Sequence, residues 1–102
     1  MQPGRPYTSG DWQVTPGREE EFAKAWTALA EWSKAEVSGA GSVTLVRSND
    51  DPSHFMSFGS WDSIDSINAW RQRPEFAEHF GRCREACDSV RAGTFTVVVS
   101  FD

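Results

Sequence analysis

The chain has 102 residues, a formal net charge of −5 and an isoelectric point near 4.9. That length suits one domain with a modest core. The acidic balance argues against binding to nucleic acid or to an anionic membrane surface, and suits a neutral or aromatic small molecule better. Five Trp and seven Phe are many for such a core, so they enlarge it, line a ligand cavity or cover a subunit interface.

The N-terminal segment 1–6 is expected to be a flexible leader, and residues 7–102 a single folded domain. The segment lacks the apolar stretch of a signal peptide. Cys83 and Cys87 are too few for a disulfide framework. The sequence therefore predicts a cytoplasmic protein.

The first half of the domain reads as strand, helix and strand. Residues 7–14 predict a strand, weakened by Gly10. Thr15 is expected to cap a helix with Pro16 at its first position and its end near Val37. The apolar stripe of this helix is Phe22, Ala25, Trp26, Leu29, Ser33 and Val37.

The next predicted strands form a hairpin. Residues 42–48 are rich in β-branched side chains, and residues 55–59 form a short apolar and aromatic run. The polar segment 49–53 between them is typical of a turn. The two strands should therefore lie side by side.

The remaining chain predicts two helices and a last strand. Residues 61–63 supply capping side chains for a short helix that carries Trp70, and Pro74 can begin a second, longer helix. Residues 94–101 are nearly all apolar and predict the final strand. The stripe of the longer helix is Phe76, Phe80, Cys83, Cys87 and Val90.

This order predicts an α+β fold of the ferredoxin-like type, β-α-β-β-α-β, with the second helical region split in two. The helices would cover one face of an antiparallel sheet. The other face would expose apolar side chains, so we expect two sheets to pack face to face in a homodimer. The side chains expected on that face, or their alternates, are Met56, Phe58, Val97 and Val99.

The order of features from residue 55 to residue 80 resembles the antibiotic biosynthesis monooxygenase family. There a strand ends in Trp-Asp/Glu-Ser, a short helix carries His or Trp near its end, and Ser/Pro-x-Phe begins a long helix. Residues 61–63, Trp70 and residues 74–76 stand at these places, within a match from about Trp12 to Phe101. The resemblance implies a dimeric α+β barrel and oxygenation of a flat aromatic molecule without metal or flavin.

Trp70 is the first candidate site residue, because the resembling family places its His or Trp beside a pocket between helices and sheet. The indole is expected to stack on a flat substrate and to donate one hydrogen bond to it. The alternative is that Trp70 only packs behind Ile67. The residues expected to contact the substrate are Trp26, Phe58, Trp61, Phe80 and His54.

His79 and Tyr7 complete the predicted catalytic group as donors to an ionised substrate oxygen. The expected reaction is oxidation of a phenol, anthrone or quinol by molecular oxygen. His79 and His54 are the groups with an ordinary pKa near neutral, and His79 is the candidate for proton transfer. A half-exposed helix position is the alternative for His79.

The sequence predicts no metal and no cofactor. His79, Cys83 and Cys87 repeat every four residues, but one helix rarely surrounds three sides of a metal ion. A nucleotide fingerprint, a phosphate loop and a Ser-His-Asp arrangement are all absent from the sequence. Asp11 would need a partner such as Arg47 if it faced the interior, and a surface position is the alternative.

Three other functions stay open at this stage. One is a small-ligand-binding dimer without catalysis, and another is cyclisation or isomerisation of a polyketide-like ring. The third is haem degradation, which some relatives in the superfamily perform. For that reaction the resemblance implies a Trp, matched by Trp70. It also implies an Asn near Gly10 and a His where Phe80 stands, and there the chain differs.

Overall fold

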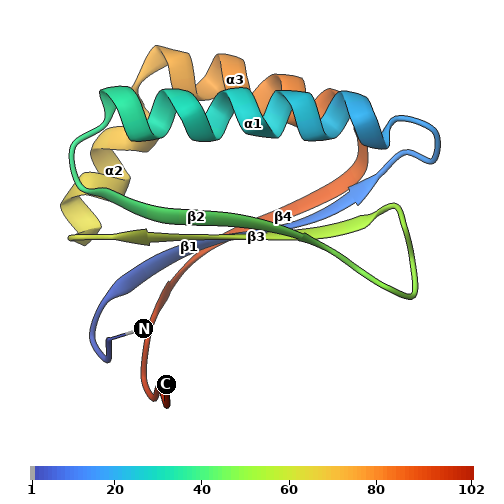
Figure 1. Ribbon diagram of the computed structural model, residues 1–102. Coiled ribbons are helices and arrows are strands. Elements are labelled where there is room, and N and C mark those ends of the chain that lie inside the picture. The colour runs from blue at the N-terminus through green and yellow to red at the C-terminus, as the bar shows by residue number, and fades with distance from the viewer. Residues whose placement is uncertain (1) are drawn as a thin grey trace.

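The computed structural model describes residues 2–102 as a four-stranded antiparallel sheet with all helices on one side (Figure 1). The strand order is β2-β3-β1-β4, so the first strand is central and the last lies at an edge. This is the predicted ferredoxin-like arrangement with a split second helical region. The elements are β1 (Pro6–Val14), α1 (Glu19–Glu36), β2 (Ala40–Arg47), β3 (His54–Trp61), α2 (Ile64–Gln72), α3 (Pro74–Glu85) and β4 (Cys87–Thr96).

The core lies between the sheet and helices α1 and α3. Apolar side chains alternate along β1, so Trp12 and Val14 point toward the helices, where the fully buried Phe22 of α1 meets them. Burying such aromatic side chains supplies most of the stabilisation in a small domain. This main core comprises Trp12, Val14, Phe22, Leu29, Phe55, Cys83 and Ala86, and a smaller cluster comprises Val37, Trp61 and Ile67.

The start of α1 differs from the prediction. Helix α1 begins at Glu19, and Thr15 does not cap it. Gly17 has a φ of 95°, and the Arg18 amide donates to the Thr15 carbonyl at 2.9 Å. These four residues therefore form a β-turn with Pro and Gly at its two central positions, as type II turns favour. The left-handed glycine delays the helix until the turn is complete.

The junction of α3 and β4 also differs from the prediction. The helix ends at Glu85 rather than near Val90, and the last strand spans Cys87–Thr96 rather than residues 94–101. Val90 pairs with Trp12 of β1. Residues after Thr96 extend past Pro6, where β1 begins, and beyond Val97 they have no backbone hydrogen bond to the N-terminal segment among the described residues.

The two helices before that junction begin as predicted. The Ser63 hydroxyl accepts a hydrogen bond from the Ser66 amide at 3.1 Å, which caps α2. Pro74 occupies the first turn of α3, where its missing N–H costs nothing. The backbone of Arg73 is extended at the residue between the helices, as expected before a proline.

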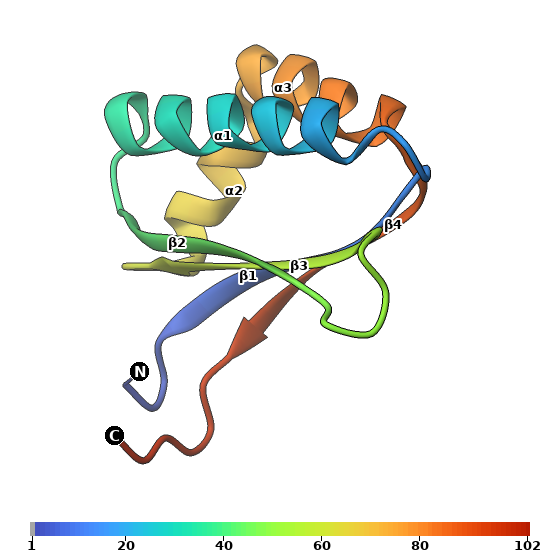
Figure 2. The same ribbon diagram turned by 45° about the vertical axis from the view of Figure 1, so that its right-hand side comes forward.

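The face of the sheet away from the helices is open, and both chain ends lie on that side (Figure 2). We call it the open face. Its register brings Tyr7 opposite Phe95 and Phe58 opposite Thr44. Phe95 is 60% exposed and Phe58 37% exposed. Of the other apolar residues expected here, Met56 lies in β3, whereas Val97 and Val99 lie in the tail after β4.

The N-terminal boundary lies one residue before the predicted one, because Pro6 already belongs to β1. Gly4 and Arg5 are tied to Val97 by backbone hydrogen bonds of 2.8 and 3.0 Å. Met1 of the predicted leader lies outside the described residues, and the flexibility of the leader stays a prediction. No helix among residues 2–102 is long and apolar enough to cross a membrane.

Candidate functional site

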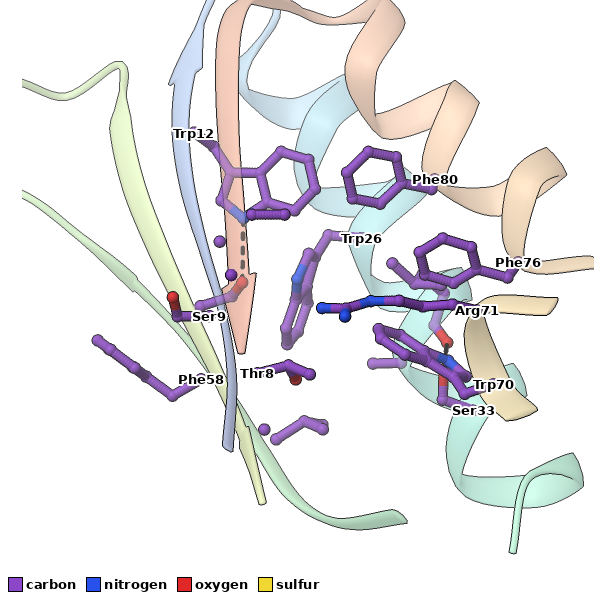
Figure 3. Close-up of a pocket in the computed structure, with 18 of the residues that line it drawn as sticks. Thr8, Ser9, Trp12, Trp26, Ser33, Phe58, Trp70, Arg71, Phe76 and Phe80 are labelled. Atoms are coloured by element: carbon purple, nitrogen blue, oxygen red, sulfur yellow. Dashed lines mark hydrogen bonds between the residues drawn. The ribbon is translucent and has the colours of Figure 1, made fainter. Parts of the chain in front are cut away.

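A cavity of about 370 Å³ lies between the sheet and the helices, beside the main core. Its walls come from α1, α2 and α3, and its floor from all four strands (Figure 3). Small-molecule sites typically have volumes of ~300–1,000 Å³ and mostly apolar linings. The aromatic side chains around it include Trp12, Trp26, Trp61, Trp70, Phe76 and Phe80.

The cavity exists because two adjacent rows of the sheet carry small side chains on strands β3, β1 and β4. In antiparallel sheets, directly paired residues point to the same face. One row on the covered face is Val43, Gly59, Thr8 and Thr94, and the next is Leu45, Ser57, Gly10 and Ala92. The third row is Arg47, Phe55, Trp12 and Val90, whose large aromatic residues fill the space.

Three of the four cavity tryptophans have their indole N–H bound within the protein. Trp12 donates to the Ser57 hydroxyl at 3.0 Å and Trp61 to the Thr8 hydroxyl at 3.1 Å. Trp70 donates to the Ser33 hydroxyl at 2.8 Å. The predicted hydrogen bond from Trp70 to a substrate therefore has a competitor, because an indole has a single N–H.

Trp70 acts as a packed wall in this arrangement. Its ring lies 4.9 Å from that of Trp61 and 4.5 Å from that of Phe76, centroid to centroid. Such tilted and edge-on pairs are favourable geometries for aromatic rings. The indole is thus held in one orientation by two rings and one hydrogen bond.

Other donors remain for a ligand. The Ser33 hydroxyl donates to the Leu29 carbonyl, but those of Thr8 and Ser57 have no acceptor among the described residues. Trp26 is the cavity tryptophan whose N–H has no partner among residues 2–102. Each of these groups can therefore donate a hydrogen bond to an oxygen in the cavity.

Two arginines line the cavity, and the sequence interpretation missed both. Arg71 of α2 extends its guanidinium into the cavity and donates to the Thr94 hydroxyl at 2.8 Å (Figure 3). Partial burial lowers the pKa of Arg71 from its ordinary value. Arg84 of α3 lies with its guanidinium carbon 5.2 Å from the centroid of the Phe80 ring. Arg71 stands four residues after buried Ile67, on the same helix face, which was the available signal.

Four of the predicted site residues border the cavity with their side chains, namely Trp26, Trp61, Trp70 and Phe80. Phe58 differs: its strand forms part of the floor, but its ring points away from the cavity to the open face (Figure 3). Period-two alternation is the reason, because the neighbouring Ser57 and Gly59 face the helices. The binding roles of the four residues stay predictions.

His54 and Asp11 lie together on the open face. His54 Nε2 is 2.7 Å from Asp11 Oδ1, so Asp11 has a partner other than the Arg47 considered from the sequence. His54 pairs with Gln13 at the far end of β1, in the row beyond those of the cavity. The structure therefore places His54 away from the predicted substrate.

Tyr7 and His79 also lie outside the cavity lining. Tyr7 shares the open face with Phe95 because Thr8, the next residue, faces the helices. The His79 ring stacks on Trp32 at 5.5 Å between the centroids, and its Nδ1 is buried without a hydrogen-bond partner among the described residues. Neither side chain lines the cavity with Trp70, and the catalytic roles of both stay predictions.

The cysteines do not form a ligand set with His79. Cys83 is buried in α3, whereas Cys87 begins β4 and donates its thiol to the Cys83 carbonyl at 3.3 Å. Burial raises the pKa of Cys83 to about 12 and that of Cys87 to about 11. Both thiols therefore stay protonated near neutral pH, which disfavours metal binding and nucleophilic chemistry.

Comparison with known families agrees with the fold. The family model for antibiotic biosynthesis monooxygenases matches residues 9–82, and this chain belongs to that family. No curated protein sequence matches the chain. The sequence-based resemblance is therefore confirmed at the level of the family.

Solved structures share the fold across nearly the whole chain. SnoaB, a cofactor-independent oxygenase from Streptomyces nogalater, superposes with a TM-score of 0.86 at 21% identity, covering 95% of this chain and 96% of that one. A protein from Caulobacter crescentus assigned to the same family has a TM-score of 0.83 at 18% identity, covering 95% and 92%. One from Bordetella bronchiseptica has a TM-score of 0.81 at 21% identity, covering 94% and 99%.

Proposed function

We propose that this protein is a cofactor-independent monooxygenase that oxidises a flat aromatic or polyketide-like molecule with molecular oxygen. The observation that carries the proposal is the cavity of about 370 Å³, walled by tryptophan and phenylalanine and floored by hydroxyl groups. Family membership and the similar fold of SnoaB support it.

The reaction is balanced without an added reductant. For an anthrone, loss of a proton from the ring methylene gives an enolate that passes one electron to oxygen. The radical pair combines to a peroxide, which loses water and leaves a carbonyl. One methylene and one oxygen molecule thus become one carbonyl and one water, with all four electrons supplied by the substrate.

The chain contributes binding and charge stabilisation. Trp26, Trp61 and Trp70 hold the planar ring, and the hydroxyls of Thr8 and Ser57 donate to its ionised oxygen. Among the described residues, the cavity lining contains no carboxylate and no imidazole. The proton therefore leaves to water rather than to a side chain.

A homodimer is part of this proposal. The open face carries Phe58, Phe95 and Val46, which are 37%, 60% and 45% exposed, and a second copy would cover them. The tail after β4 leaves the sheet on the same side and exposes 82% of Val98 and 94% of Phe101. Light scattering at micromolar concentration should give twice the chain mass, and a monomer mass would contradict this part.

Oxygen consumption tests the activity. Metal-free protein is incubated with a panel of anthrones, naphthols and hydroquinones, and oxygen uptake is compared with that of Ala30→Phe. Ala30 lines the cavity from α1, so the phenyl group should occupy the substrate volume. Uptake that is lost in Ala30→Phe but kept in Ala35→Phe, an exposed change on the same helix, supports the proposal. Uptake that Ala30→Phe leaves intact contradicts it.

A dimer that binds the same ring without oxidising it is the second candidate. The lack of a titratable base in the described cavity lining favours it. Saturable binding of the panel with no oxygen uptake, and no conversion under anaerobic conditions, would select this candidate. Anaerobic turnover would instead identify a cyclase or isomerase.

A further inference from the structure

The charge of the cavity is opposite to that of the chain. The whole protein has a formal charge of −5, yet the charged residues in the described cavity lining are Arg71 and Arg84 alone. Field lines concentrate in a cleft lined by one sign of charge with apolar walls. An anion is thus favoured in this cavity although the protein as a whole repels it.

Neither cavity arginine has a carboxylate partner. Arg18, Arg73 and Arg82 each pair with a glutamate, whereas Arg71 and Arg84, like Arg5, Arg47 and Arg91 outside the cavity lining, form no ion pair among residues 2–102. The contact that holds Arg71 is the neutral Thr94 hydroxyl, which leaves its full charge uncompensated. An anion in the cavity can therefore pair with a guanidinium that no carboxylate already holds.

We infer that the cavity binds its ligand as an anion, and that Arg71 recognises an ionised oxygen on the aromatic ring, either a phenolate or a carboxylate. This deepens the proposed function, on which it rests for the aromatic nature of the ligand. The planar guanidinium offers several N–H donors to such an oxygen, and Thr94 keeps the side chain turned inward. Trp26, Thr8 and Ser57 then donate from the other sides.

Stabilisation of the ionised ligand can promote proton loss in a cavity whose described lining contains no base. Arg71 contacts Thr94 of β4, Arg84 of α3 lines the same cavity, and no described cavity residue is an acid or a histidine. A bound phenol therefore meets positive charge only, which stabilises its ionised form and favours proton loss to water. The ionised form is also the one that gives an electron to oxygen.

Calorimetric titration with matched probes tests this inference without turnover. The probes are 2-naphthoate, its neutral amide 2-naphthamide, and 2-naphthol. A hydrogen bond to a charged group is worth enough that 2-naphthoate should bind ~10- to 100-fold more tightly than 2-naphthamide. Bound 2-naphthol should show the naphtholate absorption band at a lower pH than the free probe. Tighter 2-naphthoate without that band assigns a carboxylate, and the band without tighter 2-naphthoate assigns a phenolate.

Substitutions test whether Arg71 causes the preference for 2-naphthoate over 2-naphthamide. Arg71→Gln should bring the ratio of the two affinities, naphthoate over naphthamide, close to one, and Arg71→Lys should leave an intermediate ratio. Arg82→Gln removes the same charge at an exposed position of α3 outside the cavity lining, and it should leave the ratio unchanged. Thr94→Val keeps the cation without its anchor and should lower the ratio in part.

The outcomes separate this inference from the proposed function. Equal affinities of wild type for naphthoate and naphthamide, with no naphtholate band, overturn the inference and leave the oxygenase proposal standing. If Arg71→Gln keeps the wild-type ratio of naphthoate to naphthamide affinity, the inference is also overturned. If no probe binds wild type at millimolar concentration, the cavity is not an aromatic site and both proposals fail.

Discussion

The space between sheet and helices has two ends with opposite packing. At the filled end, Phe22 meets the rings of Trp12 and Phe55, each 5.1 Å away between centroids. At the hollow end, the paired positions of the same strands hold Gly10 and Ser57, and a cavity remains. Helices α1 and α3 contribute side chains to both ends. The volume of a few strand side chains, rather than the fold, therefore decides where a ligand can enter.

The two ends are also expected to differ in role, one in stability and the other in ligand binding. Side chains at the filled end are closely packed, so substitutions there are poorly tolerated, because each lost methylene leaves a void. At the hollow end, the polar groups that a ligand could use include those of Thr8, Ser57 and Arg71. Substitutions at the first end should act on stability, and those at the second on binding.

The largest expected effect is at the filled end. Phe22→Ala removes a fully buried ring and should lower the free energy of unfolding by about 3–5 kcal/mol. Phe80→Ala, at the border of the hollow end, should cost less because the ring is only partly buried. Urea denaturation measures both. Equal losses of unfolding free energy in the two variants would show that the two ends do not differ in packing.

Gly10→Ala sharpens the comparison at the boundary between the ends. A Cβ there would lie 2.5 Å from Trp12 Nε1 and 2.8 Å from Ser57 Oγ, so the indole must move. Overpacking of this kind should cost about 1–3 kcal/mol.

Gly81→Ala is the matched control for that change. In α3 the added Cβ meets no atom within 4 Å, and the higher helix propensity should stabilise by about 0.5–1 kcal/mol. Thermal or urea unfolding measures both variants. Destabilisation of Gly81→Ala as large as that of Gly10→Ala would remove the steric explanation.

Trp70→Phe tests the hydrogen bond that orients the cavity wall. The variant keeps a ring but leaves the Ser33 hydroxyl without its donor, which should cost about 0.5–1.5 kcal/mol. Trp26→Phe removes an indole whose N–H has no partner in the described structure, so its loss should be smaller. The difference in unfolding free energy between the two variants isolates this bond. No difference would mean that the bond adds nothing to stability.

A separate effect concerns the thiols beside the filled end, and it depends on pH. The pKa values of Cys83 and Cys87 are raised to about 12 and 11 by burial, so both thiols should react slowly with iodoacetamide at pH 8. The unfolded chain loses these protons near the ordinary pKa of 9 while the folded chain keeps them. Stability should therefore fall as pH rises from 9 toward 11.

Cys83→Ala provides the control for that pH dependence. The variant should show a shallower loss of stability across the same pH range, measured by urea denaturation at several pH values. Fast alkylation of the folded wild type at pH 8 would contradict the assignment of both thiols to a water-poor environment.

The order of elements was predictable, and two boundaries were not. The caps at Ser63 and Pro74 are local signals, and both are confirmed. Cys87 and Val90 continue a helical spacing although the chain has already turned into β4, since pairing with β1 outweighs the local pattern. Residues 97–101 look like a strand, but only Val97 is paired, by backbone hydrogen bonds to Gly4 and Arg5, because β1 begins at Pro6.

The cavity itself was only partly predictable. Its aromatic walls stand out in the sequence, but the floor depends on which small residues pair across strands, and register is a tertiary property. Gly10 appeared only to weaken a strand, yet it opens the cavity together with Ser57. The net charge of the chain favoured a neutral ligand, whereas Arg71 makes the cavity locally cationic.

Titration of Ala30→Phe with 2-naphthoate, beside Ala35→Phe and wild type, tests the central claim most directly. The claim is that the hollow end is the ligand site. Wild type and Ala35→Phe should bind with equal affinity, and Ala30→Phe should not bind, because its ring occupies the cavity that Ala30 lines. Equal binding by all three proteins would place the ligand elsewhere and contradict the account.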